Sequence, residues 1–215
     1  MNFPYISEQN PLILASASPR RKRLLTQAGL PFLSMASQVE EEGVRGEPEE
    51  ASRILAERKA SQVCSRAGKV WILGADTMVV IDDEILGKPR DREDARRMLW
   101  KLSGREHEVI TGLCILNPLA AVAHSEAVIT LVSIKGLKRQ EIEDYIETDE
   151  PFGKAGSYAI QGIGSFMVKR ISGSYTNVVG LPICALIEAL FSTGALKDFP
   201  LPHKPRIPER GVSGL

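Results

Sequence analysis

The stretch LILASASPRRKRLLTQAGL, which runs from Leu12 to Leu30, decides the fold. Residues 12–15 are an apolar run of strand length, and apolar residues at helical spacing follow it. Ser18 is a typical N-cap, because its hydroxyl can accept a hydrogen bond from an unpaired backbone N–H, and Pro19 suits the first helical position. Gly29 is the expected end of the helix. The stretch therefore predicts a β-strand whose carboxyl end leads directly into the positive end of a helix.

Two hydroxyls and two guanidinium groups gather where this helix begins, on Ser16, Ser18, Arg20 and Arg21. Free backbone N–H groups, the helix dipole and arginines all favour a bound polyanion at such a position. The alternative is a strand–turn–helix corner with solvated arginines, because local patterns of this kind recur by chance. The residues of this stretch leave both interpretations open.

The composition is that of an ordinary globular protein of 215 residues, of which 43% are hydrophobic. This length allows one large domain or two small lobes with a real core. Lys and Arg together number 27, as do Asp and Glu, so the formal net charge is zero. A zero balance argues against binding of nucleic acid or a membrane through a broad basic face. Any anion site must therefore be a local cluster.

The first residues lack the basic segment and long apolar segment of a secretory signal, and no uncharged apolar run reaches the ~18 residues of a membrane span. Cys64, Cys114 and Cys184 are widely separated and form no CxxC pair. We therefore expect reduced thiols in a cytoplasmic protein, with neither a disulfide framework nor a zinc site.

The pattern along the rest of the chain indicates an α/β protein. Further strands are predicted at 30–36, 70–75, 78–81, 84–86, 107–116, 122–134, 157–160 and 166–171. Helices are predicted at 51–67, 91–102, 138–148 and 181–191, and an acidic loop at 38–50. The four prolines after Lys197 indicate an extended or disordered tail.

Asp76 is the best single candidate for a working carboxylate. It stands between two apolar runs, 70–75 and 78–81. In α/β sheets the chemistry collects just outside the carboxyl ends of strands, so we expect Asp76 there. The alternative is a turn or capping aspartate. Lys59 lies on or beside the buried stripe of the helix 51–67, and its ammonium could emerge into a cleft or snorkel to the surface.

Two further features attract attention. The segment EPFGKAGSYAIQGIG, 150–164, carries four glycines around a predicted short strand, which implies tight turns or close approach to a ligand. It matches neither the GxGxxG nor the GxxxxGK[ST] pattern. His107 has no second histidine nearby, so a hydrogen-bonded structural role is favoured over a functional one.

At these residues the chain resembles the Maf family of nucleoside triphosphate pyrophosphatases. The matching stretches occur in family order over about residues 11 to 192. They are SASPRR (16–21), AERKA (56–60), GADT (74–77), GKP (87–89), SGREHEVITG (103–112), KAGSYAIQG (154–162) and GSYTNVVGLP (173–182). Each stretch is weak alone, but seven in register are a strong match.

The resemblance implies an α/β fold in which a long mixed β-sheet flanked by helices divides two lobes around a central cleft, as in Maf and inosine-triphosphatase-like proteins. It implies hydrolysis of a nucleoside triphosphate to the monophosphate and pyrophosphate, with a divalent cation, Mg²⁺ or Mn²⁺. The family's general base falls on Asp76. The three positions that distinguish the dTTP/UTP branch fall on Arg20, Thr77 and Gln161, and this chain is similar to that branch. A family-like homodimer is a further expectation.

The physical chemistry of the residues agrees with these implied roles. Ser16, Ser18 and Arg21 would bind phosphates at the helix start, with Lys59 and Lys88 as mobile point charges. Mg²⁺ usually takes one or two carboxylates plus substrate phosphates, so Glu41 and Asp76 could complete a metal site once nucleotide is bound. The amide of Gln161 can pair with uracil or thymine, but it can also flip to suit cytosine.

Two departures from the family pattern stand out. Gly153 occupies a position where the family usually has an acid, which removes one charge next to Lys154. Three consecutive glutamates stand where the family typically has one critical glutamate; Glu41 is favoured, and Glu40 and Glu42 are the alternatives.

The sequence therefore predicts an N-terminal extension at 1–10, a single Maf-like catalytic domain at 11–195 and a proline-rich tail at 196–215. The predicted function is removal of dTTP, UTP and modified pyrimidine nucleotides, which would limit incorporation of unwanted nucleotides. The rival hypothesis is a nucleotide-binding regulator of cell division in which hydrolysis is incidental. A role in nucleic-acid binding is disfavoured by the neutral charge.

Overall fold

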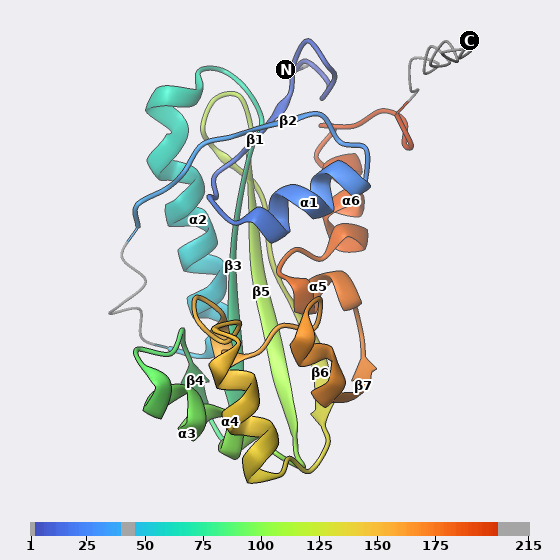
Figure 1. Cartoon of the computed structure of the whole chain (residues 1–215). Helices are drawn as coiled ribbons and strands as arrows, with labels where there is room; N and C mark the ends of the chain where they lie inside the picture. Colours follow the sequence, from blue (N-terminus) through green and yellow to red (C-terminus); the bar gives the residue numbers. More distant parts are fainter. Residues whose placement is uncertain (1–2, 40–45, 202–215) are drawn as a thin grey trace, which may run out of the picture.

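The computed structural model describes residues 3–39 and 46–201. One seven-stranded mixed sheet forms the centre, with the strand order β2-β1-β3-β5-β6-β7 and β4 paired to β3 (Figure 1). The strands are β1 (Leu12–Leu14), β2 (Phe32–Ser34), β3 (Ile72–Ile81), β4 (Glu84–Leu86), β5 (Glu106–Leu116), β6 (Val122–Ile134) and β7 (Val168–Ser172). The pairs β1–β2 and β1–β3 are parallel, and the other pairs are antiparallel. The predicted mixed sheet is confirmed.

Helices cover both faces of this sheet. The α-helices are α1 (Pro19–Gln27), α2 (Pro48–Ala67), α3 (Arg92–Leu102), α4 (Arg139–Glu147), α5 (Tyr175–Val179) and α6 (Ile183–Ser192). Two short 3₁₀-helices, η1 (Ala155–Ser157) and η2 (Ile163–Met167), lie between α4 and β7. In Figure 1, α2 runs along one side of the long strands, and α1, α5 and α6 lie on the other side.

The strand β3 changes partners along one edge. Its first residues pair with β1, where Leu14 lies opposite Leu73, and its last residues pair with β4, where Val79 lies opposite Leu86. Residues 74–78 lie between these two pairings. The sequence predicted two separate strands around Asp76, and this prediction is wrong: both runs belong to one ten-residue strand. A single acid did not end the strand, because antiparallel pairing with β5 continues through it.

The helix α2 packs on the sheet at unusually short range. A Cβ placed on Gly74 would lie 2.0 Å from the carbonyl oxygen of Ala56, and one on Gly112 would lie 2.3 Å from that of Ser52. Both glycines sit on the sheet face that α2 covers, in strands β3 and β5. Only glycine permits this approach of helix backbone to strand backbone, which brings the α2 side chains close to the middle of β3.

The opposite face of the sheet carries two separate hydrophobic cores. The first core joins α1 and α6 to the sheet and contains Leu24, Leu25, Leu73, Ala75, Leu113, Leu186 and Leu190. The second core joins α3 and α4 to the sheet and contains Val79, Leu99, Val109, Ile142 and Tyr158. Thr77 lies between Ala75 of the first core and Val79 of the second. The two lobes expected from the family therefore correspond to two cores on one sheet.

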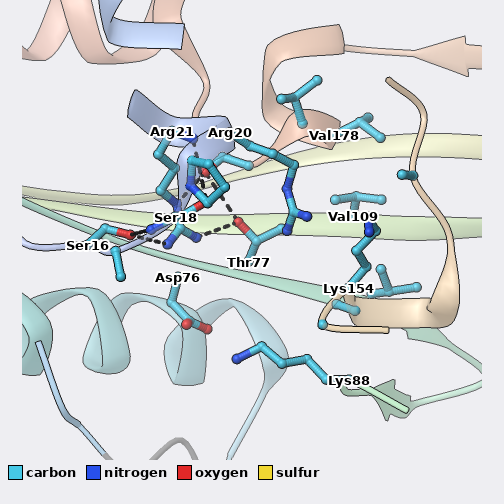
Figure 2. A pocket seen from close by; sticks show the side chains of 18 of the residues that line it. Ser16, Ser18, Arg20, Arg21, Asp76, Thr77, Lys88, Val109, Lys154 and Val178 are labelled. Carbon is cyan, nitrogen blue, oxygen red and sulfur yellow. Dashed lines mark hydrogen bonds between the residues drawn. The ribbon is translucent and has the colours of Figure 1, made fainter. Parts of the chain in front are cut away.

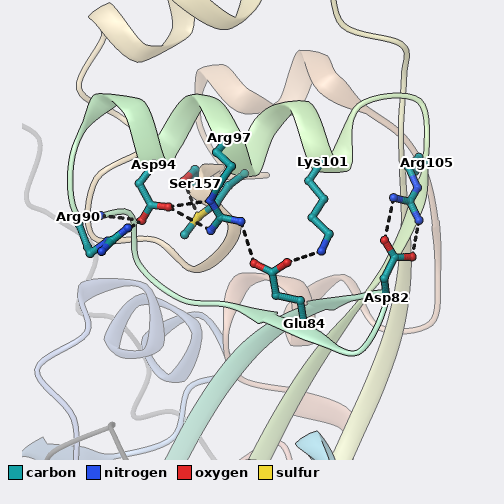
Figure 3. Close-up of polar contacts among 9 residues, drawn as sticks. Asp82, Glu84, Arg90, Asp94, Arg97, Lys101, Arg105 and Ser157 are labelled. Carbon is teal, nitrogen blue, oxygen red and sulfur yellow. Dashed lines mark hydrogen bonds and ion pairs between the residues drawn. The ribbon is translucent and has the colours of Figure 1, made fainter.

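Ion pairs fasten α3 to the hairpin of β3 and β4 (Figure 3). Glu84 of β4 accepts hydrogen bonds from Arg97, at 2.8 Å, and from Lys101, while Arg105 pairs with Asp82 in the hairpin turn at 2.5 Å. These side chains are partly exposed, so each pair alone stabilises the protein little. Together they hold the hairpin in one place, and the chain that leaves β4 carries Lys88.

Several predicted boundaries and elements need correction. Residues 157–160 form no strand, because Ser157 has a φ of 61° at the end of η1. The last strand begins at Val168 and not at 166, since η2 occupies the residues before it. The expected link 172–180 contains the short helix α5, capped by Ser174. Helix α2 begins three residues before the predicted start, with Pro48 in its first turn.

The described terminal residues pack on the domain. Trp71 donates a hydrogen bond to the carbonyl of Pro4 at 2.9 Å and meets Phe3 edge-on, and Ile6 belongs to the first core. Phe199 and Leu201 pack against the same core. No helix within the described ranges is long and apolar enough to cross a membrane.

Candidate active site

A cavity of about 440 Å³ opens at the edge of β3, where β1 has ended and β4 has not yet joined (Figure 2). Its walls include the start of α1, the middle of β3, Lys88 just after β4, and part of the loop 150–164. Nine of the site residues predicted from the sequence line it: Ser16, Ser18, Arg20, Arg21, Lys59, Asp76, Thr77, Lys88 and Gln161. Glu41, with its alternatives Glu40 and Glu42, lies outside the described residues. The structure thus brings together residues from 16 to 161 in one cavity.

Asp76 does not lie at the carboxyl end of its own strand, as the sequence suggested, but in the middle of β3. It lies instead beyond the carboxyl end of the neighbouring parallel strand β1, whose last residue is Leu14. The general rule for α/β sheets therefore holds, but for a different strand than the one assumed. The gap between β1 and β4 leaves the Asp76 side chain access to the cavity.

Lys59 and Asp76 form a buried ion pair. The ammonium of Lys59 lies 2.5 Å from Oδ1 of Asp76, and the two residues are 7% and 6% exposed. Lys59 extends from α2, which the glycine contacts hold close to β3. The pair fixes the orientation of the carboxylate, and loss of Lys59 would leave the buried carboxylate without this compensating charge. In Figure 2, the side chain of Lys88 points toward Asp76. We call Lys59, Asp76 and Lys88 the carboxylate end.

Arg21 is a buried clamp between three parts of the chain. Its guanidinium donates to the carbonyl of Gly180 at 2.7 Å, to Oγ1 of Thr77 at 3.0 Å and to Oγ of Ser16 at 3.3 Å. These bonds join the start of α1, the strand β3 and the turn between α5 and α6. Arg21 was predicted to bind phosphate. In the structure, its guanidinium donates hydrogen bonds to Gly180, Thr77 and Ser16 of the protein itself. Its positive charge still borders the cavity.

The start of α1 is capped as predicted. Oγ of Ser18 accepts a hydrogen bond from the backbone N–H of Arg21, and Oγ of Ser16 accepts one from that of Ser18 at 3.2 Å. Pro19 occupies the first turn. The N-terminal end of this nine-residue helix therefore faces the cavity with its dipole and hydroxyls, which suits an anionic ligand.

Thr77 joins the network behind this helix end. Its Oγ1 lies 2.9 Å from Oγ1 of Thr111 on β5 and 3.4 Å from the carbonyl of Gly180. The register places Thr77 directly opposite Thr111 in the sheet. Hydrogen bonds to Arg21, Thr111 and Gly180 hold the Thr77 hydroxyl in place. This one short side chain therefore supplies a fixed polar group to this wall of the cavity.

Arg20 and Lys154 lie on the far side of Thr77 from Asp76 and point toward one another in Figure 2. Val109 and Val178 are their apolar neighbours in that view. Burial lowers the pKa of the Arg20 guanidinium, and burial followed by repulsion from Arg20 lowers the pKa of Lys154. We call Arg20, Lys154, Val109 and Val178 the loop end. Sequence reasoning did not select Lys154, although its place between Gly153 and Gly156 was a signal of close ligand approach.

The loop 150–164, which carries Lys154 and Gln161, is organised by Glu150. The Glu150 carboxylate accepts hydrogen bonds from the backbone N–H of Ile163 at 2.8 Å, that of Gly164 at 3.0 Å and the Tyr145 hydroxyl at 3.0 Å. Burial raises the pKa of Glu150, but these donors and the nearby Lys154 charge outweigh it and lower the pKa. Lys154 also donates to the Glu150 carbonyl. The charge of Glu150 thus acts on Lys154, next to which Gly153 replaces the acid that the family usually has.

His107 has the hydrogen-bonded position that the sequence favoured, and its partner lines the cavity. Its Nε2 lies 2.8 Å from the hydroxyl of Tyr158, and the rings meet edge-on. His107 is 3% exposed, and burial lowers its pKa to about 4. A neutral imidazole therefore supports Tyr158 at ordinary pH.

The carboxylate groups available for a metal ion are few. Among the described residues that line the cavity, Asp76 carries the one carboxylate. In the ranges 3–39 and 46–201, no three His, Cys, Asp or Glu side chains are grouped so as to hold a metal ion. One carboxylate together with substrate phosphates is a usual ligand set for Mg²⁺, which keeps several waters and binds few protein ligands.

The family profile described as "Maf-like protein" matches residues 11–193. A protein of Geobacter metallireducens named "dTTP/UTP pyrophosphatase" is 50% identical over 190 residues, which cover 88% of this chain and 99% of that protein. A protein of Ruminiclostridium cellulolyticum with the same name is 51% identical over 177 residues, which cover 80% and 90% of the two chains.

Among solved structures, a "Nucleoside-triphosphatase / dITP/XTP pyrophosphatase" from Mycobacterium abscessus aligns with a TM-score of 0.38 and 16% identity, over 58% of this chain and 74% of that chain. We draw nothing from a likeness of this size.

Proposed function

The chain belongs to the Maf-like protein family, and from that premise we propose that it is a nucleoside triphosphate pyrophosphatase that hydrolyses dTTP and UTP to the monophosphate and pyrophosphate. Relatives about 50% identical over most of the chain carry the name of this activity. The single observation that supports the proposal best is the Lys59–Asp76 pair, a carboxylate held by an ammonium in a cavity bordered by further cations.

The triphosphate would bind along the carboxylate end and the start of α1. Lys88 points toward Asp76, so its ammonium can reach phosphate oxygens near the reacting bond. Ser16, Ser18 and the helix dipole add donors and positive potential at the same wall. These groups compensate the charge that a triphosphate brings into a partly closed site.

Asp76 would accept a proton from the water molecule that attacks phosphorus. The bond between the attacked phosphorus and the bridging oxygen breaks, the proton stays on the carboxylate, and pyrophosphate leaves with the bonding electrons. Lys59 holds the carboxylate in the orientation that this proton transfer needs. Lys59 and Lys88 lie where negative charge develops on the phosphate oxygens.

A divalent cation, Mg²⁺ or Mn²⁺, is part of this proposal. Asp76 would hold it together with Glu41 and phosphate oxygens. When bound, the cation would neutralise charge on the phosphates and on the leaving pyrophosphate.

Base selection would fall to Arg20, Thr77 and Gln161, as the family pattern implies. The amide of Gln161 offers one donor and one acceptor to the edge of uracil or thymine. We expect Gln161→Ala to lower the preference for uracil-type bases more than it lowers triphosphate binding in general. Equal losses for all bases would count against this role.

The test is a panel of nucleoside triphosphates with Mg²⁺ or Mn²⁺, in which inorganic pyrophosphatase converts released pyrophosphate to phosphate for colorimetric detection. We expect release from dTTP and UTP, and none when inorganic pyrophosphatase is omitted. Phosphate without the auxiliary enzyme would indicate cleavage at the γ-phosphate. Absence of release from dTTP and UTP would favour the rival hypothesis of a nucleotide-binding regulator of cell division.

The cytoplasmic location and the homodimeric state of the protein stay predictions. Size-exclusion chromatography with light scattering measures the second directly.

A further inference from the structure

The loop end contains two cations that face each other. Arg20 and Lys154 project toward one another in Figure 2. Their proximity is repulsive, since the Arg20 charge lowers the pKa of Lys154. Within the part of the chain that the structure describes, Arg20 has no hydrogen-bond acceptor and no ion-pair partner. Two like charges held at one place, partly withdrawn from water, favour a ligand that brings hydrogen-bond acceptors.

The side chain of Lys154 is held in place by its own loop. Its Nζ donates to the Glu150 carbonyl, and Glu150 in turn binds the backbone at Ile163 and Gly164. An ammonium has three N–H donors and no acceptor, so donors beyond the one used for Glu150 can serve a ligand. Val109 and Val178 line the same end, which suits the flat apolar faces of a base better than a fully hydrated phosphate.

The proposed substrates pose a problem that Gln161 cannot solve. Uracil and thymine carry an oxygen at C4, which accepts hydrogen bonds, whereas cytosine carries an amino group there, which donates. The Gln161 amide can rotate and so satisfy either edge. A side chain that can only donate cannot satisfy both bases. Opposite the C4 amino group of cytosine, two hydrogen-bond donors would face each other.

We propose that Lys154 is a further specificity-determining residue, which donates from Nζ to the C4 oxygen of uracil or thymine beside Arg20 and thereby disfavours cytosine. The inference rests on the proposed function, since it concerns the base of the same nucleotide. The C2 oxygen is common to all three pyrimidines, so discrimination between them must come from the N3 and C4 edge. Lys154 supplies the fixed donor that this edge requires.

The test compares Lys154→Met, which keeps the length of the side chain but has no donor, with Lys154→Arg, which keeps donors. Lys169→Met is the matched control, because Lys169 is an exposed residue of β7 that does not line the cavity. For each protein kcat/KM is measured with UTP, CTP and 4-thio-UTP, whose sulfur at C4 is a weak acceptor. Thermal unfolding confirms that the variants fold.

We expect Lys154→Met to lower the UTP/CTP ratio of kcat/KM at least about tenfold, which corresponds to ~1.4 kcal/mol. The loss should fall on UTP, and the preference of the unmodified enzyme for UTP over 4-thio-UTP should disappear. Lys154→Arg should keep the ratio within about threefold, and Lys169→Met should not change it. Equal losses for UTP and CTP in Lys154→Met would overturn the proposal and assign Lys154 to phosphate binding. Unchanged kcat/KM for both nucleotides would overturn it as well.

A binding measurement separates failure of this proposal from failure of the proposed function. Calorimetry with the α,β-methylene analogues of dUTP and dCTP, whose α–β link cannot be hydrolysed, reports base selection without turnover. We expect the unmodified protein to prefer the dUTP analogue and Lys154→Met to lose that preference. An unmodified protein that binds selectively without releasing pyrophosphate would refute the proposed activity alone. Selectivity that survives Lys154→Met would refute the role of Lys154 alone.

Discussion

The two ends of the cavity are built from different parts of the fold. The carboxylate end stands on regular elements, because Asp76 belongs to β3 and Lys59 to α2, and two glycines bring their backbones together. At the loop end, Lys154 belongs to the irregular segment 150–164, which Glu150 organises through its hydrogen bonds. The groups proposed for chemistry are thus fixed by regular elements, while two of the groups proposed for base selection, Lys154 and Gln161, are carried by a loop.

Charge balance differs between the two ends as well. At the carboxylate end a buried cation and a buried anion compensate one another at 2.5 Å. At the loop end two cations face each other, and both have a lowered pKa. The Lys59–Asp76 pair therefore holds its own counter-charge, whereas the Arg20–Lys154 pair gains from the arrival of an acceptor. This difference suggests that substitutions at one end should affect rate and at the other end selectivity.

The largest effect is expected from Asp76→Asn, which keeps the size of the side chain but removes the base. We predict a fall in kcat of at least about 10³-fold, in the range that general-base catalysis supplies. Affinity for dTTP should change by less than about tenfold. Single-turnover kinetics and calorimetry measure the two quantities. The comparison would fail if the UTP/CTP preference in binding changed as much as the rate.

The next prediction concerns the contact between α2 and the sheet. Gly74→Ala places a methyl group 2.0 Å from the Ala56 carbonyl, so the helix must move. We expect a loss of about 3 kcal/mol in the free energy of unfolding, the upper part of the usual range for overpacking. Chemical denaturation measures it. The matched control is Gly136→Ala, because a Cβ at Gly136 meets no atom within 4 Å in the described part of the chain, and a comparable loss there would contradict the explanation.

The sequence predicted much of this arrangement. The capping of α1 by Ser18 and the apolar runs of β1 and β3 were readable because local chemistry decides them. The position of Asp76 beyond the end of β1 was not, since it depends on which strands are neighbours. The donors of Arg21 were assigned to phosphate, and only the folded chain shows that Gly180, 159 residues away, accepts one of them. Long-range pairing of this kind leaves no local signal.

A third prediction concerns His107, which supports Tyr158 on the cavity wall. Burial lowers the folded-state pKa of His107 to about 4, below the ordinary value of 6.5. The unfolded chain therefore binds the proton more readily between these pH values, and stability is lost as the pH falls from about 6.5 to about 4. This group contributes at most about 3 kcal/mol to that loss.

His107→Gln, which can still bond Tyr158, should show a flatter dependence of the free energy of unfolding on pH over this window. Denaturant titrations at pH 4.5, 5.5 and 7 measure the slopes of both proteins. Carboxyl groups with lowered pKa, such as that of Glu150, destabilise both proteins in acid and cancel in the comparison. Identical slopes would contradict the prediction, because they would show that His107 binds its proton equally well in the folded and unfolded states.

The smallest effect is expected from Glu150→Gln, which sharpens the comparison at the loop end. The two carboxylate oxygens of Glu150 accept hydrogen bonds from the backbone N–H groups of Ile163 and Gly164. The amide nitrogen of glutamine replaces one of these oxygens and cannot accept, so one N–H loses its partner. We predict a loss of about 1–2 kcal/mol in stability and a severalfold weaker UTP/CTP preference, with kcat for UTP within about threefold. Glu147→Gln, an exposed change at the end of α4, is the control. A loss of rate larger than the loss of preference would merge the two ends into one functional unit.

The most direct test is the structure of the Asp76→Asn variant with uncleaved UTP and Mg²⁺. We expect the α-phosphate beside residue 76, the triphosphate along Lys59, Lys88 and the start of α1, and the C4 oxygen within hydrogen-bond distance of Lys154 Nζ. A nucleotide bound in the opposite sense, with its triphosphate between Arg20 and Lys154 and its base near residue 76, would contradict it.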